Sequence, residues 1–220
     1  MMSREQVINS IRASLKRAEA LDPNVIRSLE ARDSAMQPHV QPAFDEDLVE
    51  RVIRKHEAVH GSVVRIASLD DLAATVHAYL EELDLPDELV AASHGDLVSA
   101  LKESAIKVEF RPTRGDDLVA LSVADAAIAE TGTLVLVSSA HAPMLHNYLP
   151  DHHLVLLRTS SIVRWQEDVW RILKEQDNFP PRGIAMITGP SKTADVEQTL
   201  EYGAHGPRAV HLIVFNDSSD

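Results

Sequence analysis

Short apolar runs alternate with helical patterns between Ser62 and Phe110, and this alternation most limits how the chain can fold. The expected strands are 62–67, 88–92 and 106–110, and the expected helices between them are 68–83 and 96–104. Parallel strands need a long crossover connection, which a helix of this length supplies. We therefore predict an α/β fold of Rossmann-like architecture, with a mostly parallel sheet, helices on both faces and right-handed crossovers.

Further elements are expected on both sides of this region. Apolar periodicity predicts helices at 48–59, 162–176 and 195–201, and strands at 125–129, 134–137, 153–157, 183–188 and 209–215. At the start of the chain, Ser3 and Gln6 form a capping-box pattern ahead of an amphipathic helix. Prolines without periodicity follow at 22–44. We expect 1–44 to form an N-terminal helix and an irregular linker, and 45–220 to form the α/β domain.

Composition narrows the classes of partner. The 220 residues include 21 Lys and Arg against 34 Asp and Glu, a formal net charge of -13. A chain this acidic repels phosphate backbones, so nucleic acid is not an expected partner. Apolar runs are too short for a membrane span, and the first residues do not build a signal-peptide core. A cytoplasmic location is the resulting expectation, and the N-terminal helix leaves a homo-oligomer open.

Metal and iron–sulfur chemistry find little support in the residue types. The chain has no cysteine, so it offers no thiolate for an iron–sulfur cluster. Its 11 histidines do not form a metal-ligand pattern. His56 and His60 are four residues apart on a predicted helix, but no third ligand accompanies them, which favours a packed or surface pair. No metal site and no iron–sulfur cluster are expected on this chain, and any other cofactor stays unassigned.

Two apolar runs meet at the bend Glu130-Thr131-Gly132-Thr133, which predicts a strand that turns sharply back on itself. Gly132 suits the bend because glycine adopts positive φ without a Cβ clash and lets another group approach the main chain. One interpretation makes Glu130 a solvated turn residue, with the threonines satisfying local hydrogen bonds. The other presents Glu130 as a candidate catalytic carboxylate, with Thr131, Gly132 and Thr133 as ligand-binding residues.

A second loop follows the strand expected at 183–188. The candidate ligand-binding residues there are Gly189, Pro190, Ser191, Lys192 and Thr193. Backbone N–H groups at a helix start and the charge of Lys192 would suit a small anionic ligand. Ordinary helix capping by side chains is the competing interpretation. In open α/β sheets, ligands bind outside the carboxyl ends of strands, so we expect this loop and the Glu130 bend on one rim.

Three segments, in this order, resemble the LutC/YkgG family of LUD-domain proteins, which is associated with bacterial lactate utilization. They are Ala129–Thr133, Leu149–His153 and Thr188–Glu197. The resemblance covers roughly Val63 to Phe215. It implies that 45–220 is a LUD-type domain, similar to the NagB/RpiA/CoA-transferase-like fold. It also implies a role beside iron–sulfur proteins that oxidise L-lactate to pyruvate.

Two functional hypotheses remain at this point. In the first, the chain is a LutC-like, non-redox component of a lactate-oxidising system. In the second, it is an independent enzyme of the CoA-transferase or isomerase type that acts on a small anionic substrate. Glu130 would then serve as nucleophile or general base, because a carboxylate can form an acyl intermediate or move a proton.

Overall fold

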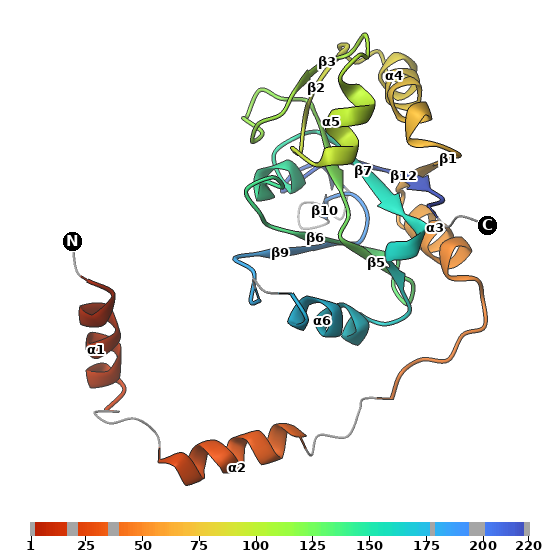
Figure 1. Cartoon of the computed structure of the whole chain (residues 1–220). Coiled ribbons are helices and arrows are strands. Elements are labelled where there is room, and N and C mark those ends of the chain that lie inside the picture. Colours follow the sequence, from red (N-terminus) through yellow and green to blue (C-terminus); the bar gives the residue numbers. More distant parts are fainter. Residues whose placement is uncertain (1–2, 17–21, 35–39, 177–178, 194–200, 218–220) are drawn as a thin grey trace. The chain divides into compact units, whose positions relative to one another are not determined.

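The larger of two main sheets in the computed structural model has six strands in the order β1–β12–β7–β4–β2–β3 (Figure 1). The strands are β1 (Ser62–Ile66), β2 (Glu88–Ala91), β3 (Lys107–Glu109), β4 (Val119–Val123), β7 (His152–Arg158) and β12 (Ala209–Phe215). Every neighbouring pair is parallel. The predicted mostly parallel sheet is confirmed, although β4 was not foreseen. The structure describes residues 3–16, 22–34, 40–176, 179–193 and 201–217.

A second sheet contains the predicted hairpin. Its strand order is β8–β5–β6–β9, and β5 pairs antiparallel with β6. The strands are β5 (Ala126–Ile128), β6 (Thr133–Val137), β8 (Ile162–Val163) and β9 (Ile184–Ile187). A short ribbon pairs β10 (Lys192–Thr193) with β11 (Glu201–Tyr202). The sequence predicted the hairpin, whereas only the structure shows that it leaves the main sheet.

The main sheet is covered by helices on one face and by the second sheet and a helix on the other. On β7, Leu154 and Leu156 pack with helices α4 (Leu72–Glu82) and α5 (Gly95–Leu101). Val155 and Leu157 face the opposite way, toward the second sheet and helix α3 (Leu48–Ala58). Successive strand residues point to opposite faces, so a strand whose residues are all apolar is buried on both sides.

The second sheet is also covered on both faces. Leu134 and Leu136 of β6 pack toward the main sheet, while Val135 and Val137 pack toward helix α6 (Gln166–Lys174). Figure 1 shows the resulting succession, from α4 and α5 through the two sheets to α6. Three 3₁₀ turns, η1 (Leu69–Asp71), η2 (Met144–Asn147) and η3 (Thr159–Ser161), complete the connections.

The prediction of an irregular linker at 22–44 is wrong for Pro23–Ser34, which form a helix. Residues 1–41 form a compact unit of their own, apart from 42–220, and the described part of it contains α1 (Arg4–Ser14) and α2 (Pro23–Ser34). Pro23 stands at the first position of α2, where its missing N–H costs no hydrogen bond. Asp22 accepts the N–H of Asn24 through its side chain, at 2.7 Å. The capping box of α1 at Ser3 is confirmed.

One other predicted helix is shifted, and a second lies mostly outside the described residues. The helix expected at 162–176 begins four residues late, because Ile162 and Val163 pair with β5 as strand β8. The helix expected at 195–201 falls mostly on residues 194–200, outside the described residues, and Glu201 at its end belongs to strand β11. None of the helices in the described part of the chain is long and apolar enough to cross a lipid bilayer.

Four histidines lie in the interior in their neutral form. His56 is fully buried and donates its Nε2–H to the carbonyl of Val210, at 3.2 Å. Burial lowers the pKa of His56 and of His146. Burial also lowers the pKa of His153 to about 3 and that of His211 to about 4. The predicted packed or surface role of His56 is thus confirmed as a packed one.

Helix α3 approaches two glycines closely. Gly132 has φ 73° and Gly189 has φ 86°, conformations that residues with a Cβ rarely adopt. A Cβ on Gly132 would lie 2.5 Å from Cβ of Lys55, and one on Gly189 would lie 2.6 Å from Cγ2 of Val59. The expected positive φ at Gly132 is confirmed, and the group that approaches its main chain is helix α3.

We expect Gly132→Ala to lower the free energy of unfolding by roughly 2–4 kcal/mol, because strain at positive φ adds to the clash with α3. Chemical denaturation measures the change. The matched control is Gly95→Ala, since a Cβ there meets nothing within 4 Å and alanine favours the helix. Equal stabilities of the two variants would contradict this account of α3.

The buried histidines predict a loss of stability in mild acid. His153 and His211 stay neutral in the folded chain, while unfolded histidine takes up a proton below its ordinary pKa of 6.5. Stability is therefore full above pH 6.5 and falls as the pH drops toward 4. Each histidine should cost about 1.3 kcal/mol between pH 7.5 and 5.5. Chemical denaturation at the two pH values tests this prediction. The control is His205→Gln, an exposed change that should leave the acid-induced loss of stability unchanged. A free energy of unfolding that does not change between the two pH values would refute it.

Candidate functional site

The Glu130 bend is held at the tip of the β5–β6 hairpin by Arg51 of α3. The Nε of Arg51 donates to the carbonyl of Ala129 at 2.9 Å, and a terminal nitrogen donates to the carbonyl of Glu130 at 3.5 Å. The guanidinium also lies 3.9 Å from the ring centroid of Phe44 and pairs with Glu46 at 3.0 Å. Sequence reasoning missed Arg51, because nothing local links it to a bend 79 residues away.

A chain of three hydroxyls joins the two sequence motifs. Oγ1 of Thr131 lies 2.6 Å from Oγ1 of Thr133, which lies 2.7 Å from Oγ1 of Thr188. The pairing of β6 with β9 places Thr133 beside Thr188, and Gly189 follows directly. The structure therefore brings the Glu130 bend and the start of the 189–193 loop together.

The rest of that loop is hydrogen-bonded within the protein. Ser191 donates its N–H to the carbonyl of Pro207 at 2.8 Å and accepts the N–H of Gly203 at 3.1 Å. Its Oγ accepts the N–H of His205 at 3.4 Å. Lys192 belongs to strand β10, with Nζ 5.9 Å from the ring centroid of Tyr202. Lys192 and Thr193 thus form a strand, and the helix start expected at Asp195 lies outside the described residues. The charge of Lys192 is a means by which the described part of the loop could hold an anion.

Glu130 itself is half-buried. Its N–H donates to the carbonyl of Arg164 at 3.0 Å, so its backbone is fixed on both sides. Among the described residues, no hydrogen bond or ion pair holds its carboxylate. A carboxylate on a fixed backbone, next in sequence to Thr131 of the hydroxyl chain, is able to accept a proton or to bind a donor group.

A cavity of about 320 Å³ lies at the carboxyl ends of β2, β4 and β7, where ligands bind in open α/β sheets. Its polar lining side chains are His94, Asp125, Ser138, Ser139, His141, Arg158, Ser161 and Gln176. Asp125 is reachable from solvent and accepts the N–H of Val137 at 2.7 Å. Desolvation by the surrounding protein raises the pKa of the Asp125 carboxyl. Sequence reasoning placed Asp125 at the start of a strand without assigning it a role.

Arg158, the arginine that lines this cavity, already forms ion pairs within the protein. Arg158 pairs with Asp96 and, at 3.5 Å, with Asp217. These partners raise the pKa of Arg158, mainly through the hydrogen bond to Asp96. Because two carboxylates share one guanidinium, the cavity offers little net attraction to an anion. It is better suited to a ligand that donates hydrogen bonds.

The Glu130 bend and the cavity that Asp125 lines are at opposite ends of the β5–β6 hairpin. Asp125 and Val137 form its base at the cavity, while Glu130 and Gly132 form its tip. Thr133 and Val137 are the two ends of β6, and the four residue steps between them rise by about 13 Å. The sheet edge favoured by fold geometry and the motifs favoured by sequence are therefore different sites.

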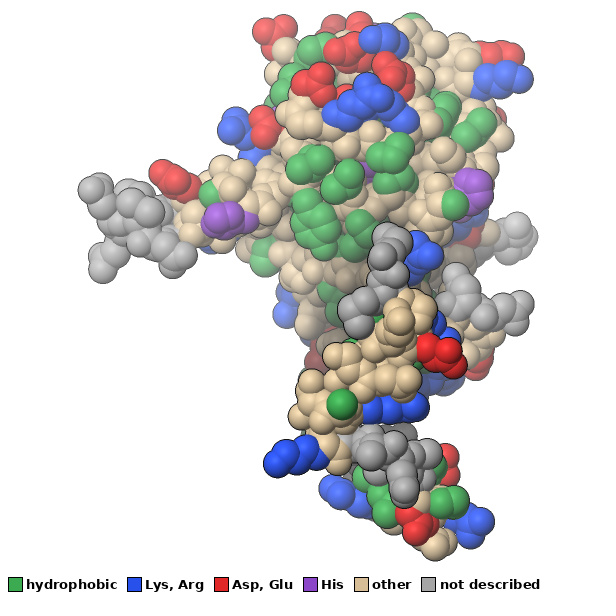
Figure 2. Space-filling model, turned by 90° about the vertical axis from the view of Figure 1, so that its left-hand side faces the viewer, with side chains coloured by type: hydrophobic (Ala, Val, Ile, Leu, Met, Phe, Trp, Pro, Cys, Tyr) green, Lys and Arg blue, Asp and Glu red, His purple; other side chains and the backbone are tan. Residues whose placement is uncertain are grey.

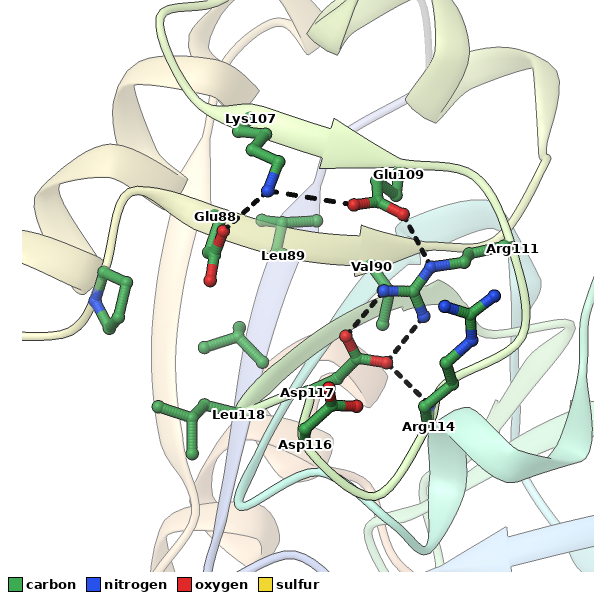
Figure 3. A pocket seen from close by; sticks show the side chains of 12 residues that line it. Glu88, Leu89, Val90, Lys107, Glu109, Arg111, Arg114, Asp116, Asp117 and Leu118 are labelled. Atoms are coloured by element: carbon green, nitrogen blue, oxygen red, sulfur yellow. Dashed lines mark hydrogen bonds and ion pairs between the residues drawn. The ribbon is translucent and has the colours of Figure 1, made fainter.

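A third pocket, along β2 and β3 and at the amino end of β4, is filled with ion pairs (Figure 3). Lys107 pairs with Glu88 at 3.0 Å, and Arg111 contacts both oxygens of Asp117 at 2.7 and 2.8 Å. Hydrogen bonding to Asp117 raises the pKa of Arg111, and the same bond lowers the pKa of Asp117. These charges satisfy one another, so the network fixes the connection from β3 to β4.

One face of the molecule gathers hydrophobic side chains next to charged ones (Figure 2). Exposed large apolar residues occur around η2 and just before β4, namely Leu118, Leu145, Tyr148 and Leu149. The carbonyl of Leu118 accepts the N–H of His152 at 2.9 Å, which brings the two segments together. Contiguous exposed apolar surface is typical of protein contacts. Among the described residues, no group of three or more acidic or histidine side chains is placed to hold a metal.

Comparisons with known proteins agree with this architecture. A 1.70 Å crystal structure of a DUF162 family protein from Deinococcus radiodurans superposes with a TM-score of 0.59 at 17% identity, covering 80% of this chain and 100% of that one. An uncharacterized protein of Neisseria meningitidis serogroup B is 42% identical over 92 residues, 42% of this chain and 40% of that protein.

Two further relatives are named Lactate utilization protein C. The one from Bacillus velezensis is 37% identical over 102 residues, 45% of this chain and 42% of that protein. The one from Anoxybacillus flavithermus is 33% identical over 99 residues, with 45% and 44% covered. The chain thus aligns with less than half the length of these curated relatives. The family model of the LUD domain matches residues 49–215, and the chain belongs to the LUD domain family.

Proposed function

We propose that this chain acts in lactate utilization, as a LutC-like, non-redox component of a system that oxidises L-lactate to pyruvate. Its membership of the LUD domain family and its similarity to proteins named Lactate utilization protein C support the proposal. The sequence contains no cysteine, so thiolate-bound iron–sulfur clusters would reside on partner proteins in the cytoplasm.

The exposed apolar side chains around η2 support contact with such partners. Leu145, Tyr148 and Leu149 are each between 45% and 49% exposed, and apolar surface of this kind is stabilised when a partner covers it. The unpartnered apolar positions of α1, Val7 and Ile11, are also exposed and support a homo-oligomer as an additional contact.

The site we assign to this function is the junction of the two motifs. Glu130 is the candidate catalytic residue, and the candidate ligand-binding residues are Thr131, Gly132, Thr133, Gly189, Pro190, Ser191, Lys192 and Thr193. The observation that carries this assignment is the hydroxyl chain Thr131–Thr133–Thr188, which joins the two motifs and begins at the residue next to Glu130. Hydroxyl donors together with the charge of Lys192 suit a small anion. The comparisons do not favour an independent CoA transferase or isomerase.

Glu130→Gln should abolish lactate-dependent growth in a strain that lacks the native protein, because the variant keeps side-chain size and removes the charge. The variant protein should unfold at the same denaturant concentration as the original, since no partner of the carboxylate is lost among the described residues. Glu57→Gln, an exposed change on α3, is the control and should support full growth. Full growth with a well-expressed Glu130→Gln protein would return Glu130 to the role of a solvated turn residue.

A further inference from the structure

A broad groove of about 860 Å³ separates helix α4 from strand β1, on the opposite face of the main sheet from the Glu130 bend. β1 is an edge strand of the six-stranded sheet, so no further strand of that sheet lies beyond it under α4. Small side chains on α4, Ala74 and Ala78, leave the groove open, and Val64 and Leu83 add apolar walls. A volume of this size accommodates an organic molecule of ordinary metabolite size.

The floor of the groove is a hydrogen-bonded aromatic cluster. The ring of Tyr79 lies over that of His211 with centroids 4.4 Å apart, and its hydroxyl lies 2.9 Å from Nδ1 of His152. Oγ of Ser62 lies 2.8 Å from Nδ1 of His211. Tyr79 and His211 are only 9% and 8% exposed, so packing holds the cluster in place before any ligand arrives.

This floor carries no charge near neutral pH. Burial lowers the pKa of His211 to about 4 and also lowers that of His152, while it raises the pKa of Tyr79 to about 12. The charged side chains that line the groove are the acids Asp71 and Glu82, and no Lys or Arg is among its lining residues. A carboxylate or phosphate would meet repulsion at the rim and no cation inside.

The hydrogen bonds already made decide what the imidazoles present to a ligand. A phenol hydroxyl is a good donor, so Tyr79 leaves Nδ1 of His152 as an acceptor and the proton on Nε2. The same assignment holds for His211 when the Ser62 hydroxyl donates to its Nδ1. Neither Nε2 atom has a hydrogen-bond partner among the described residues. Because both histidines line the groove, each is able to supply an Nε2–H donor to a ligand there.

We propose that this groove binds an uncharged, mainly apolar small molecule that carries a hydrogen-bond acceptor such as a ketone carbonyl. The acceptor would take an Nε2–H from His211 or His152, and the apolar body would lie along Ala74 and Ala78. This site is separate from the proposed lactate function, because neither Glu130 nor the 189–193 loop lines the groove.

The test uses the fluorescent ketone 6-propionyl-2-dimethylaminonaphthalene, whose emission moves to the blue in apolar surroundings, with the full-length chain. We expect saturable binding with a blue shift, and at least tenfold weaker binding to Ala78→Trp, which fills the groove from the exposed face of α4. Ala58→Trp places the same side chain on an exposed position of α3, on the opposite face of the main sheet, and should bind as the original does. Equal binding by both variants, or none by the original chain, would overturn the site.

A second comparison tests the ligand class. 2-Acetylnaphthalene should displace the fluorescent ketone, whereas 2-naphthoate, with a carboxylate in place of the methyl ketone, should be at least tenfold weaker. Ser62→Ala should weaken the ketone several-fold while leaving the denaturation midpoint in place, because Ser62 is exposed and its loss frees Nδ1 of His211 to hold the proton instead. Naphthoate binding as tight as the ketone would refute the uncharged class. Ala78→Trp should still support growth on lactate, so a failure of the groove proposal can be told apart from a failure of the proposed role of Glu130.

Discussion

The close contact between helix α3 and two glycines organises much of this molecule. Gly132 and Gly189 adopt positive φ and have no Cβ, so Lys55 of α3 and Val59 at its C-cap come within a distance that any other residue would forbid. The helix then fills the face that the main sheet shares with the hairpin sheet. The same contact directs Arg51 onto the bend that carries Glu130. A turn that sequence alone would assign to a ligand is thus also a packing requirement of the fold.

Ion pairing distinguishes the charged side chains that hold the structure together from those that are free to bind a ligand. Arg111 and Arg158 are each held by two carboxylates, so neither is free to attract a substrate. Their hydrogen bonds fix loops at opposite ends of the main sheet. In an acidic chain, basic side chains used in this way leave few cations for anion binding. The carboxylate of Glu130, which has no partner among the described residues, is therefore more informative about function than the larger ion-pair network of Figure 3.

The motif junction and the α4–β1 groove differ in chemistry. The junction contains a chain of three threonine hydroxyls, and the proposed ligand there is a small polar molecule. The groove combines apolar walls with neutral imidazoles whose pKa values are lowered by burial. The main sheet lies between them, because its alternating side chains bury one face under α4 and the other under the hairpin sheet. The two proposed sites therefore lie on opposite sides of the main sheet and differ in the ligands proposed for them.

The sequence by itself determined the parallel sheet, the hairpin around Gly132 and the capped helix at Ser3, because period, glycine and capping residues act over a few neighbours. It also indicated the family, through motifs near Glu130 and Gly189. Only the tertiary structure decided that the hairpin forms a second sheet, that Thr133 meets Thr188, and that Arg51 holds the bend. Those contacts join residues 55 to 79 positions apart. Side-chain packing sets such distant pairings, and no local pattern encodes it.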